Sequence, residues 1–238
     1  MEVEDIRSIL SNIRSRSIFG KIKRYEYMPY SIDNALNIVE GIGKMRNSRF
    51  VIDEDNRFTY LNFIKWIHGD SSMLCLDPRT REVISGRLNA GIYIAGNTGT
   101  GKSWCLEIMT DYCVIDNVRI SISDKEQFLR WKNVRVDEIC DTYVTTGDIS
   151  EFKKKDILGI QDLGAEQPES MYMGNRMNVL QQILESRGDR SDKITLITSN
   201  LPINHEILLN RYHDRVTSRL CEMCNYFEIK GKDRRKNI

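Results

Sequence analysis

The sequence lacks any apolar run long enough to cross a membrane. Its opening, Met-Glu-Val-Glu-Asp, is too acidic for a secretory signal peptide. The formal net charge is only +1, so no global attraction to a polyanion exists and any nucleic-acid contact must come from a local patch. Six cysteines are scattered among the 238 residues, several in apolar patterns, as reduced buried thiols are. These absences predict a cytoplasmic protein with no membrane partner.

Metal-ligand patterns are also scarce. The three histidines, His68, His205 and His213, fit neither a metal-ligand spacing nor a catalytic triad. Cys221 and Cys224 have the spacing of one zinc-ligand pair, but no second pair accompanies them and their segment is predicted to be helical. A zinc site is therefore disfavoured.

The stretch that carries chemistry runs from residue 96 to residue 103 and matches the phosphate-binding template G-x-x-x-x-G-K-[ST]. Its three glycines let consecutive backbone N–H groups turn inward toward an anion. Lys102 brings positive charge to the β- and γ-phosphates, and the Ser103 hydroxyl is a hard oxygen ligand for Mg²⁺. The sequence therefore predicts binding of a nucleoside triphosphate. The residues expected around it are Gly96, Asn97, Thr98, Gly99, Thr100, Gly101, Lys102, Ser103 and Trp104.

Alternating strands and helices surround this motif. An apolar run at 91–95 precedes it and a largely apolar helix over 104–112 follows it, which is the context that the motif requires. Further strands are predicted at 118–123, 156–160, 194–198 and 226–230, and further helices at 136–147, 177–187 and 204–223. The alternation predicts an α/β, three-layer fold with a five-stranded, mainly parallel sheet and ligands at the carboxyl ends of its strands.

The chain is expected to divide into a helical N-terminal region with a linker, 1–85, and a nucleotide-binding domain, 86–238. Within the first part, helices are predicted at 1–17, at 32–45 with Ser31 as cap, and at 60–68 between a Thr59 cap and a Gly69 stop, with 70–90 as linker. The apolar stripe of 1–17 either packs on its own domain or meets a partner helix.

Two basic segments leave alternatives open. Residues 21–30 interleave cations with three tyrosines, a mixture that suits single-stranded nucleic acid, although a plain connector is the preferred interpretation. The basic C-terminal tail either contacts DNA phosphates or is a solvated terminus.

Polar residues follow the later strands, and here the order of motifs resembles the AAA+ ATPases, within them the DnaC/IstB group of helicase loaders and transposition helpers. The resemblance runs from about residue 88 to the end of the chain. It rests on five stretches, Gly96–Ser103, Ile157–Glu166, Thr195–Leu201, Arg211–Leu220 and Gly231–Arg235. It implies an AAA+-type P-loop fold.

The resemblance also implies roles at the second acidic motif, where this sequence departs from the pattern. Gln161 stands where an acidic residue normally holds Mg²⁺ through water, and Asp162 stands where a carboxylate polarises the attacking water. A glutamine adds no negative charge, so Mg²⁺ affinity should fall. Asp162 could then become the metal partner beside Ser103, leaving Glu166 or no residue to orient water.

Further roles follow from the same resemblance. Asn200 matches a sensor of the γ-phosphate, and Arg219 resembles the arginine finger that acts on a neighbouring subunit's nucleotide, which implies a homo-oligomer. Arg215 is either structural or assists it. Arg235 resembles the second sensor arginine, and the adjacent Arg234 could take its place.

The expected function is that of a DnaC-like, ATP- and Mg²⁺-dependent loader of a replicative helicase on single-stranded DNA, with the N-terminal helices as the candidate helicase-binding module. One alternative is an IstB-like partner of a transposase. Another is a switch that binds ATP without hydrolysing it, which Gln161 keeps open. A small-molecule kinase is disfavoured, because no acceptor site is evident.

Overall fold

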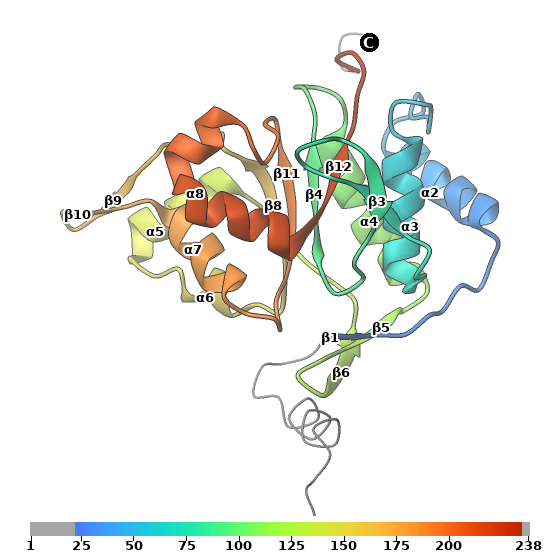
Figure 1. Ribbon diagram of the computed structural model, residues 1–238, viewed down its shortest axis with the longest axis horizontal. Helices are drawn as coiled ribbons and strands as arrows, with labels where there is room; N and C mark the ends of the chain where they lie inside the picture. The colour runs from blue at the N-terminus through green and yellow to red at the C-terminus, as the bar shows by residue number, and fades with distance from the viewer. Residues whose placement is uncertain (1–21, 235–238) are drawn as a thin grey trace, which may run out of the picture.

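The computed structural model describes residues 22–234 and is built around one twisted sheet of seven strands (Figure 1). In spatial order the strands are β3 (Val83–Ser85), β2 (Leu74–Leu76), β12 (Cys224–Glu228), β4 (Gly91–Ala95), β11 (Ile194–Ser199), β8 (Ile157–Leu163) and β7 (Asn133–Arg135). The five strands from β12 to β7 are parallel, and β2–β3 is an antiparallel hairpin at one edge. The predicted α/β class with a mainly parallel sheet is confirmed.

Helices cover both faces of the sheet and make three layers (Figure 1). One face carries α2 (Ile32–Arg46), α3 (Arg57–His68) and α4 (Lys102–Ile115); the other carries α5 (Val136–Thr146), α6 (Ser150–Lys154), α7 (Val179–Gly188) and α8 (Glu206–Met223). Because successive strand residues point to opposite faces, Ile92 and Ile94 of β4 belong to the first core and Tyr93 and Ala95 to the second.

The strand predicted at 118–123 exists but lies outside the main sheet. It is β5 (Arg119–Ile122), the middle strand of a small antiparallel sheet with β1 (Ile22–Arg24) and β6 (Lys125–Phe128). Ser123 and Asp124 both take positive φ angles, 51° and 60°, which give the tight turn of a two-residue hairpin. The fifth parallel position is filled by β7, whose three residues are too few to show a periodic pattern.

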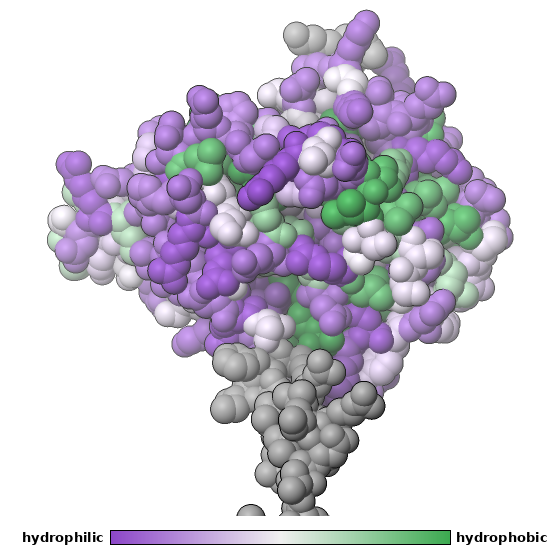
Figure 2. Space-filling view, viewed as in Figure 1, coloured by the Kyte–Doolittle hydropathy of each residue, from purple (hydrophilic) through white to green (hydrophobic). Residues whose placement is uncertain are grey.

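Residues 70–90 do not form a linker, contrary to the sequence prediction. They contain the β2–β3 hairpin, whose turn is closed by the Asp77 carboxylate accepting from the N–H groups of Arg79 and Thr80. Figure 2 shows hydrophobic surface on the viewer's side of the molecule where Figure 1 draws β3, and the exposed apolar side chains of the hairpin are Leu74, Val83 and Ile84.

The helix caps were predicted with mixed success. Ser31 caps α2 by accepting from the Asn34 N–H, and Gly69 ends α3 with φ of 70°, as predicted. Thr59 does not cap α3, since the helix begins at Arg57; its hydroxyl donates to the Glu228 carbonyl instead.

Between β8 and α7, a hairpin of β9 (Ser170–Tyr172) and β10 (Asn175–Met177) extends from the body of the fold (Figure 1). Within residues 22–234, no helix has the length and apolarity needed to cross a membrane. The helix predicted at 1–17 lies outside the described residues.

The helices before β4 share a core with α4. Trp66 of α3 is fully buried, donates from Nε1 to the Ala90 carbonyl at 2.8 Å, and lies in edge contact with Trp131. The Arg24 guanidinium lies 4.6 Å from the Trp66 ring centroid and donates to the carbonyls of Trp66 and Ile67. Arg24 is therefore a half-buried structural residue. The domain boundary near residue 85 stays a prediction.

Replacing Trp66 with alanine is expected to lower the free energy of unfolding by about 3–5 kcal/mol, because a large buried ring and its hydrogen bond are lost. Met45→Ala on α2, where the side chain is 81% exposed, should change it by no more than about 0.5 kcal/mol. Urea unfolding followed by circular dichroism measures both. A Trp66 variant in which 22–85 unfolds alone, with the remainder unaffected, would contradict the shared core.

Candidate nucleotide-binding site

The register of the parallel strands brings the predicted site residues to one edge of the sheet. Ser199 of β11 pairs with Ala95 of β4 on one side and with Leu163 of β8 on the other. The phosphate loop after β4, Asn200 after β11, and the end of β8 therefore lie together. This is the edge at which open α/β sheets bind ligands.

The phosphate loop takes the turns that its glycines allow. Gly99 is buried with φ of +80°, a conformation that L side chains rarely adopt. A Cβ on Gly96 would lie 2.3 Å from the Ile229 carbonyl oxygen, so this position needs glycine for the close approach of two backbones. The Thr100 hydroxyl donates to the Asn97 carbonyl at 3.0 Å and closes the turn.

Lys102 and Asn200, two predicted site residues far apart in the sequence, are in direct contact. The Lys102 Nζ donates to the Asn200 Oδ1 and to the Asn97 carbonyl, each at 2.8 Å, and the lysine is only 5% exposed. The ammonium is thus held at the first turn of α4, where the helix N-terminus also favours an anion.

The end of β8 points its two polar side chains in different directions. Gln161 is 6% exposed, and its Nε2 donates to Glu107 Oε1 of α4 at 3.0 Å. Asp162 has φ of 63° at a bulge in the ladder, and its Oδ2 lies 3.4 Å from Arg135 Nη1. Sequence reasoning missed both partners. Only Glu107 left a signal, since it follows Ser103 by four residues on a helix.

Three side chains on or against the first two turns of α4 suit a hard cation. Hydroxyl, amide and carboxylate oxygens are the donors that Mg²⁺ prefers, and Ser103, Gln161 and Glu107 supply one of each. Among the described residues, no group of three or more Asp, Glu, His or Cys is placed to hold a metal by itself. That combination fits Mg²⁺ bound jointly by phosphates, water and few protein groups.

Glu166, the alternative residue for orienting water, has a structural role. Its carboxylate is buried, accepts from the Tyr212 hydroxyl and the Gly164 N–H, and lies 3.4 Å from Arg211 Nη1. Burial, and then the neighbouring Glu166 carboxylate, raises the pKa of Tyr212 well above its usual value, so this hydroxyl stays a donor. Glu166 therefore joins the loop after β8 to α8.

The C-terminal segment lies against the phosphate loop. The Arg234 N–H donates to the Gly99 carbonyl at 3.0 Å, and a Cβ built on Gly99 would lie 1.9 Å from Asp233 Oδ1. The Arg234 guanidinium donates to Asp53 at 2.8 Å, and this hydrogen bond is the main cause of the lowered pKa of Asp53. Sequence reasoning missed Asp233. Arg235 lies outside the described residues.

Arg219 lies away from the phosphate loop of its own chain. Its Nη2 is 2.8 Å from Asp189, directly after α7, and Arg215 lies 3.5 Å from the same carboxylate. This is the edge at which β11 and β12 begin, opposite the edge with Lys102. His213, with φ of 63°, interrupts α8 and lets its second half take a different direction.

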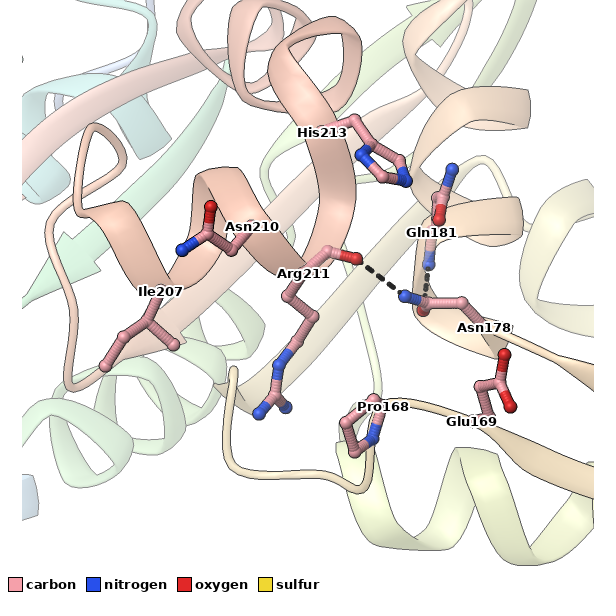
Figure 3. A pocket seen from close by; sticks show the side chains of 8 residues that line it. All are labelled: Pro168, Glu169, Asn178, Gln181, Ile207, Asn210, Arg211 and His213. Atoms are coloured by element: carbon pink, nitrogen blue, oxygen red, sulfur yellow. Dashed lines mark hydrogen bonds between the residues drawn. The ribbon is translucent and has the colours of Figure 1, made fainter.

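An open hollow of about 450 Å³ lies between the first turns of α7 and α8 (Figure 3). There the Asn178 side chain donates to the Arg211 carbonyl at 2.9 Å. No predicted site residue lines the hollow, so it is separate from the nucleotide site. Its lining consists of Pro168, Glu169, Asn178, Gln181, Ile207, Asn210, Arg211 and His213.

The cysteines of the Cys221 and Cys224 pair are free thiols. The Cys224 Sγ donates to the Thr195 carbonyl, and burial raises the pKa of its thiol to about 12. Burial also raises the pKa of Cys221. A thiolate is the form that binds metal, so both observations disfavour zinc here.

Glu166→Gln is expected to lower the free energy of unfolding by about 1–3 kcal/mol, because the buried contacts to Tyr212 and Arg211 depend on the carboxylate. Glu169→Gln is the matched control on the exposed part of the same loop and should have little effect. Thermal unfolding of both variants measures the difference. Unchanged stability in Glu166→Gln would instead favour a role in orienting water.

No protein-family model and no curated protein matches the sequence. Among solved structures, a proposed primosome component from Streptococcus pyogenes serotype M3 matches with a TM-score of 0.52 and 19% identity, over 78% of this chain and 85% of that chain. DnaI matches with a TM-score of 0.50 and 19% identity, over 86% and 95%. The DnaC helicase loader has a TM-score of 0.47 and 15% identity, over 77% and 95%.

At these identities the likeness concerns the fold. The chain has the α/β, AAA+-type P-loop fold of the first two structures.

Proposed function

We propose that this chain binds ATP with Mg²⁺ and hydrolyses it as a DnaC-like loader of a replicative helicase on single-stranded DNA. The observation that carries the nucleotide part is the contact between Lys102 and Asn200, made where the phosphate loop and two strand ends meet. A buried ammonium beside an amide at a helix N-terminus is suited to the terminal phosphates of a nucleotide.

The residues divide the work by position. The loop N–H groups and Lys102 hold the phosphates, and Asn200 aligns the terminal one. Bound Mg²⁺ would neutralise charge on the β- and γ-phosphates, with Ser103 as a ligand. Asp162 is the carboxylate that polarises the attacking water. It does so after Arg135 has moved away, or with one carboxylate oxygen while the other stays paired with Arg135. An Arg219 from a neighbouring subunit completes the site, which makes the active form an oligomer.

The loader role rests on two supports. The five motifs occur in the order of the DnaC/IstB group, and the fold is shared with a proposed primosome component. Residues 1–85 are the candidate helicase-binding module. Affinity capture distinguishes this role from an IstB-like role. Retention of a purified replicative helicase by the chain supports the loader, and retention of a purified transposase supports the IstB-like role.

A second candidate function, a switch that binds ATP without hydrolysing it, is favoured by three features of the site. Gln161 carries no charge, Asp162 is paired with Arg135, and the Glu166 carboxylate is engaged by Tyr212. None of these features weakens the phosphate loop. Binding without turnover is the outcome that distinguishes this switch from a working ATPase.

ATP turnover by the purified protein should be measurable, should change when single-stranded DNA is added, and should be absent from Lys102→Ala, which lacks the phosphate-binding ammonium. Steady-state phosphate release with and without DNA measures it. ATP binding followed through Trp104, the exposed tryptophan beside Ser103, supplies the parallel readout. Binding with no turnover above the Lys102→Ala blank would establish the switch and reject the ATPase.

Asp233→Asn is expected to strengthen ATP binding about fivefold, because it removes an anion that lies against Gly99, in competition with phosphate. Asp55→Asn is the matched control, since Asp55 faces Gly231 of the same segment rather than the loop. Equilibrium titration of each variant with ATP gives the ratio. Equal affinities in the wild type and Asp233→Asn would show that the carboxylate does not compete.

A further inference from the structure

We propose that Glu107 supplies the negative charge that Gln161 lacks, acting as a positioning residue for Mg²⁺ through the waters of the bound ion. The inference rests on the proposed ATP and Mg²⁺ binding and adds a residue to it. The juxtaposition that carries it is the 3.0 Å hydrogen bond from Gln161 Nε2 to Glu107 Oε1.

Helix geometry places Glu107 beside the metal ligand. It follows Ser103 by four residues on α4, slightly more than one turn, so both side chains lie on one face of the helix about 6 Å apart at their Cβ atoms. Helical side chains lean toward the N-terminus, so the Glu107 carboxylate leans back toward Ser103. Mg²⁺ keeps several of its waters, and a carboxylate one turn away reaches such waters rather than the ion itself.

The buried end of β8 joins the pair. Gln161 is 6% exposed and faces α4, so its amide contacts the group on α4 that carries the charge. A glutamine orients a carboxylate by donating to one of its oxygens and leaves the negative charge in place. Gln161 and Glu107 together thus provide the negative charge at the metal site that a single aspartate at position 161 would provide.

The local charge balance leaves a net negative charge for the ion. Arg46, near the end of α2, donates to Glu107 Oε2 and, at 2.8 Å, to Asp111 Oδ2. One cation is therefore shared between two carboxylates on α4. Glu107 faces Gln161 with its other oxygen, whereas Asp111 lies one turn farther from Ser103.

Asp162 is less well placed for the same task. Gln161 and Asp162 differ in their partners: Gln161 contacts α4, and Asp162 contacts Arg135 at the end of β7. Arg135 is shared between Asp162 and Asp137, as Arg46 is shared between Glu107 and Asp111, so it is the direction of the two side chains that separates them: Asp162 lies toward β7, and Glu107 lies on the helix that carries Ser103. The geometry therefore favours Glu107 as the metal-side carboxylate and leaves Asp162 available for water.

The test measures how the ATP affinity depends on Mg²⁺, and not only the turnover of the loaded protein. ATP is titrated at a series of Mg²⁺ concentrations and in EDTA, with Trp104 fluorescence as the readout. Glu107→Gln should raise the Mg²⁺ concentration that gives half of the full gain in ATP affinity by about 10–100-fold, because loss of an outer-shell partner typically weakens metal binding by that factor. The ATP affinity measured in EDTA should be unchanged. Asp111→Asn, which also loses a contact to Arg46, should shift it less than about threefold.

A rescue variant separates a charge effect from a structural one. Adding Gln161→Asp to Glu107→Gln places a carboxylate on the facing strand. The double variant should return the half-maximal Mg²⁺ concentration most of the way to the wild-type value. An unchanged Mg²⁺ dependence in Glu107→Gln, with ATP still bound, overturns the inference alone. An equal increase of the half-maximal Mg²⁺ concentration in Glu107→Gln and Asp111→Asn also overturns it. A wild-type protein that binds no ATP overturns both the inference and the proposed function.

Discussion

The hydrogen bond between the Lys102 ammonium and the Asn200 side chain depends on almost every large-scale feature of the fold. A charged nitrogen that is nearly buried is costly unless oxygens surround it, and here Asn97 and Asn200 supply them. The contact requires the turn of the phosphate loop and the pairing of β4 with β11 in one register. A shift of that register by one residue would point the strand's side chains to the other face and separate the two groups.

Around this cation, three carboxylates near the site are each paired with an arginine from another element. Arg46 of α2 contacts Glu107, Arg135 at the end of β7 contacts Asp162, and Arg211 of α8 lies beside Glu166. The first two pairs are partly exposed and can rearrange at little cost, whereas in the third the Glu166 carboxylate is buried and breaking the pair is costly. The site therefore combines one largely buried ion pair, Glu166 with Arg211, with two partly exposed ion pairs that a bound anion or cation can rearrange.

The sequence predicted what local patterns determine and missed what long-range pairing determines. The phosphate loop, the helices α2, α5 and α8 and the parallel strands β4, β8 and β11 follow from local periodicity and glycine positions. The placement of β5 in a separate sheet depends on pairing with β1, about a hundred residues earlier, which periodicity does not contain. Glu107 and Asp233 were missed for the same reason, since each acquires its meaning from a segment distant in the sequence.

The position of α2 and α3 gives the N-terminal part of the chain a physical route to the site. These helices share one hydrophobic core with α4, and Arg46 of α2 reaches across to the helix that begins at Lys102. A protein that binds 22–85 and displaces α2 must therefore move the counter-ion of Glu107 at the same time. By linkage, if Mg²⁺ binding changes the contacts of Glu107 as proposed, it must bias α2 in return, and the two contacts of Arg46 would then couple partner binding to nucleotide state.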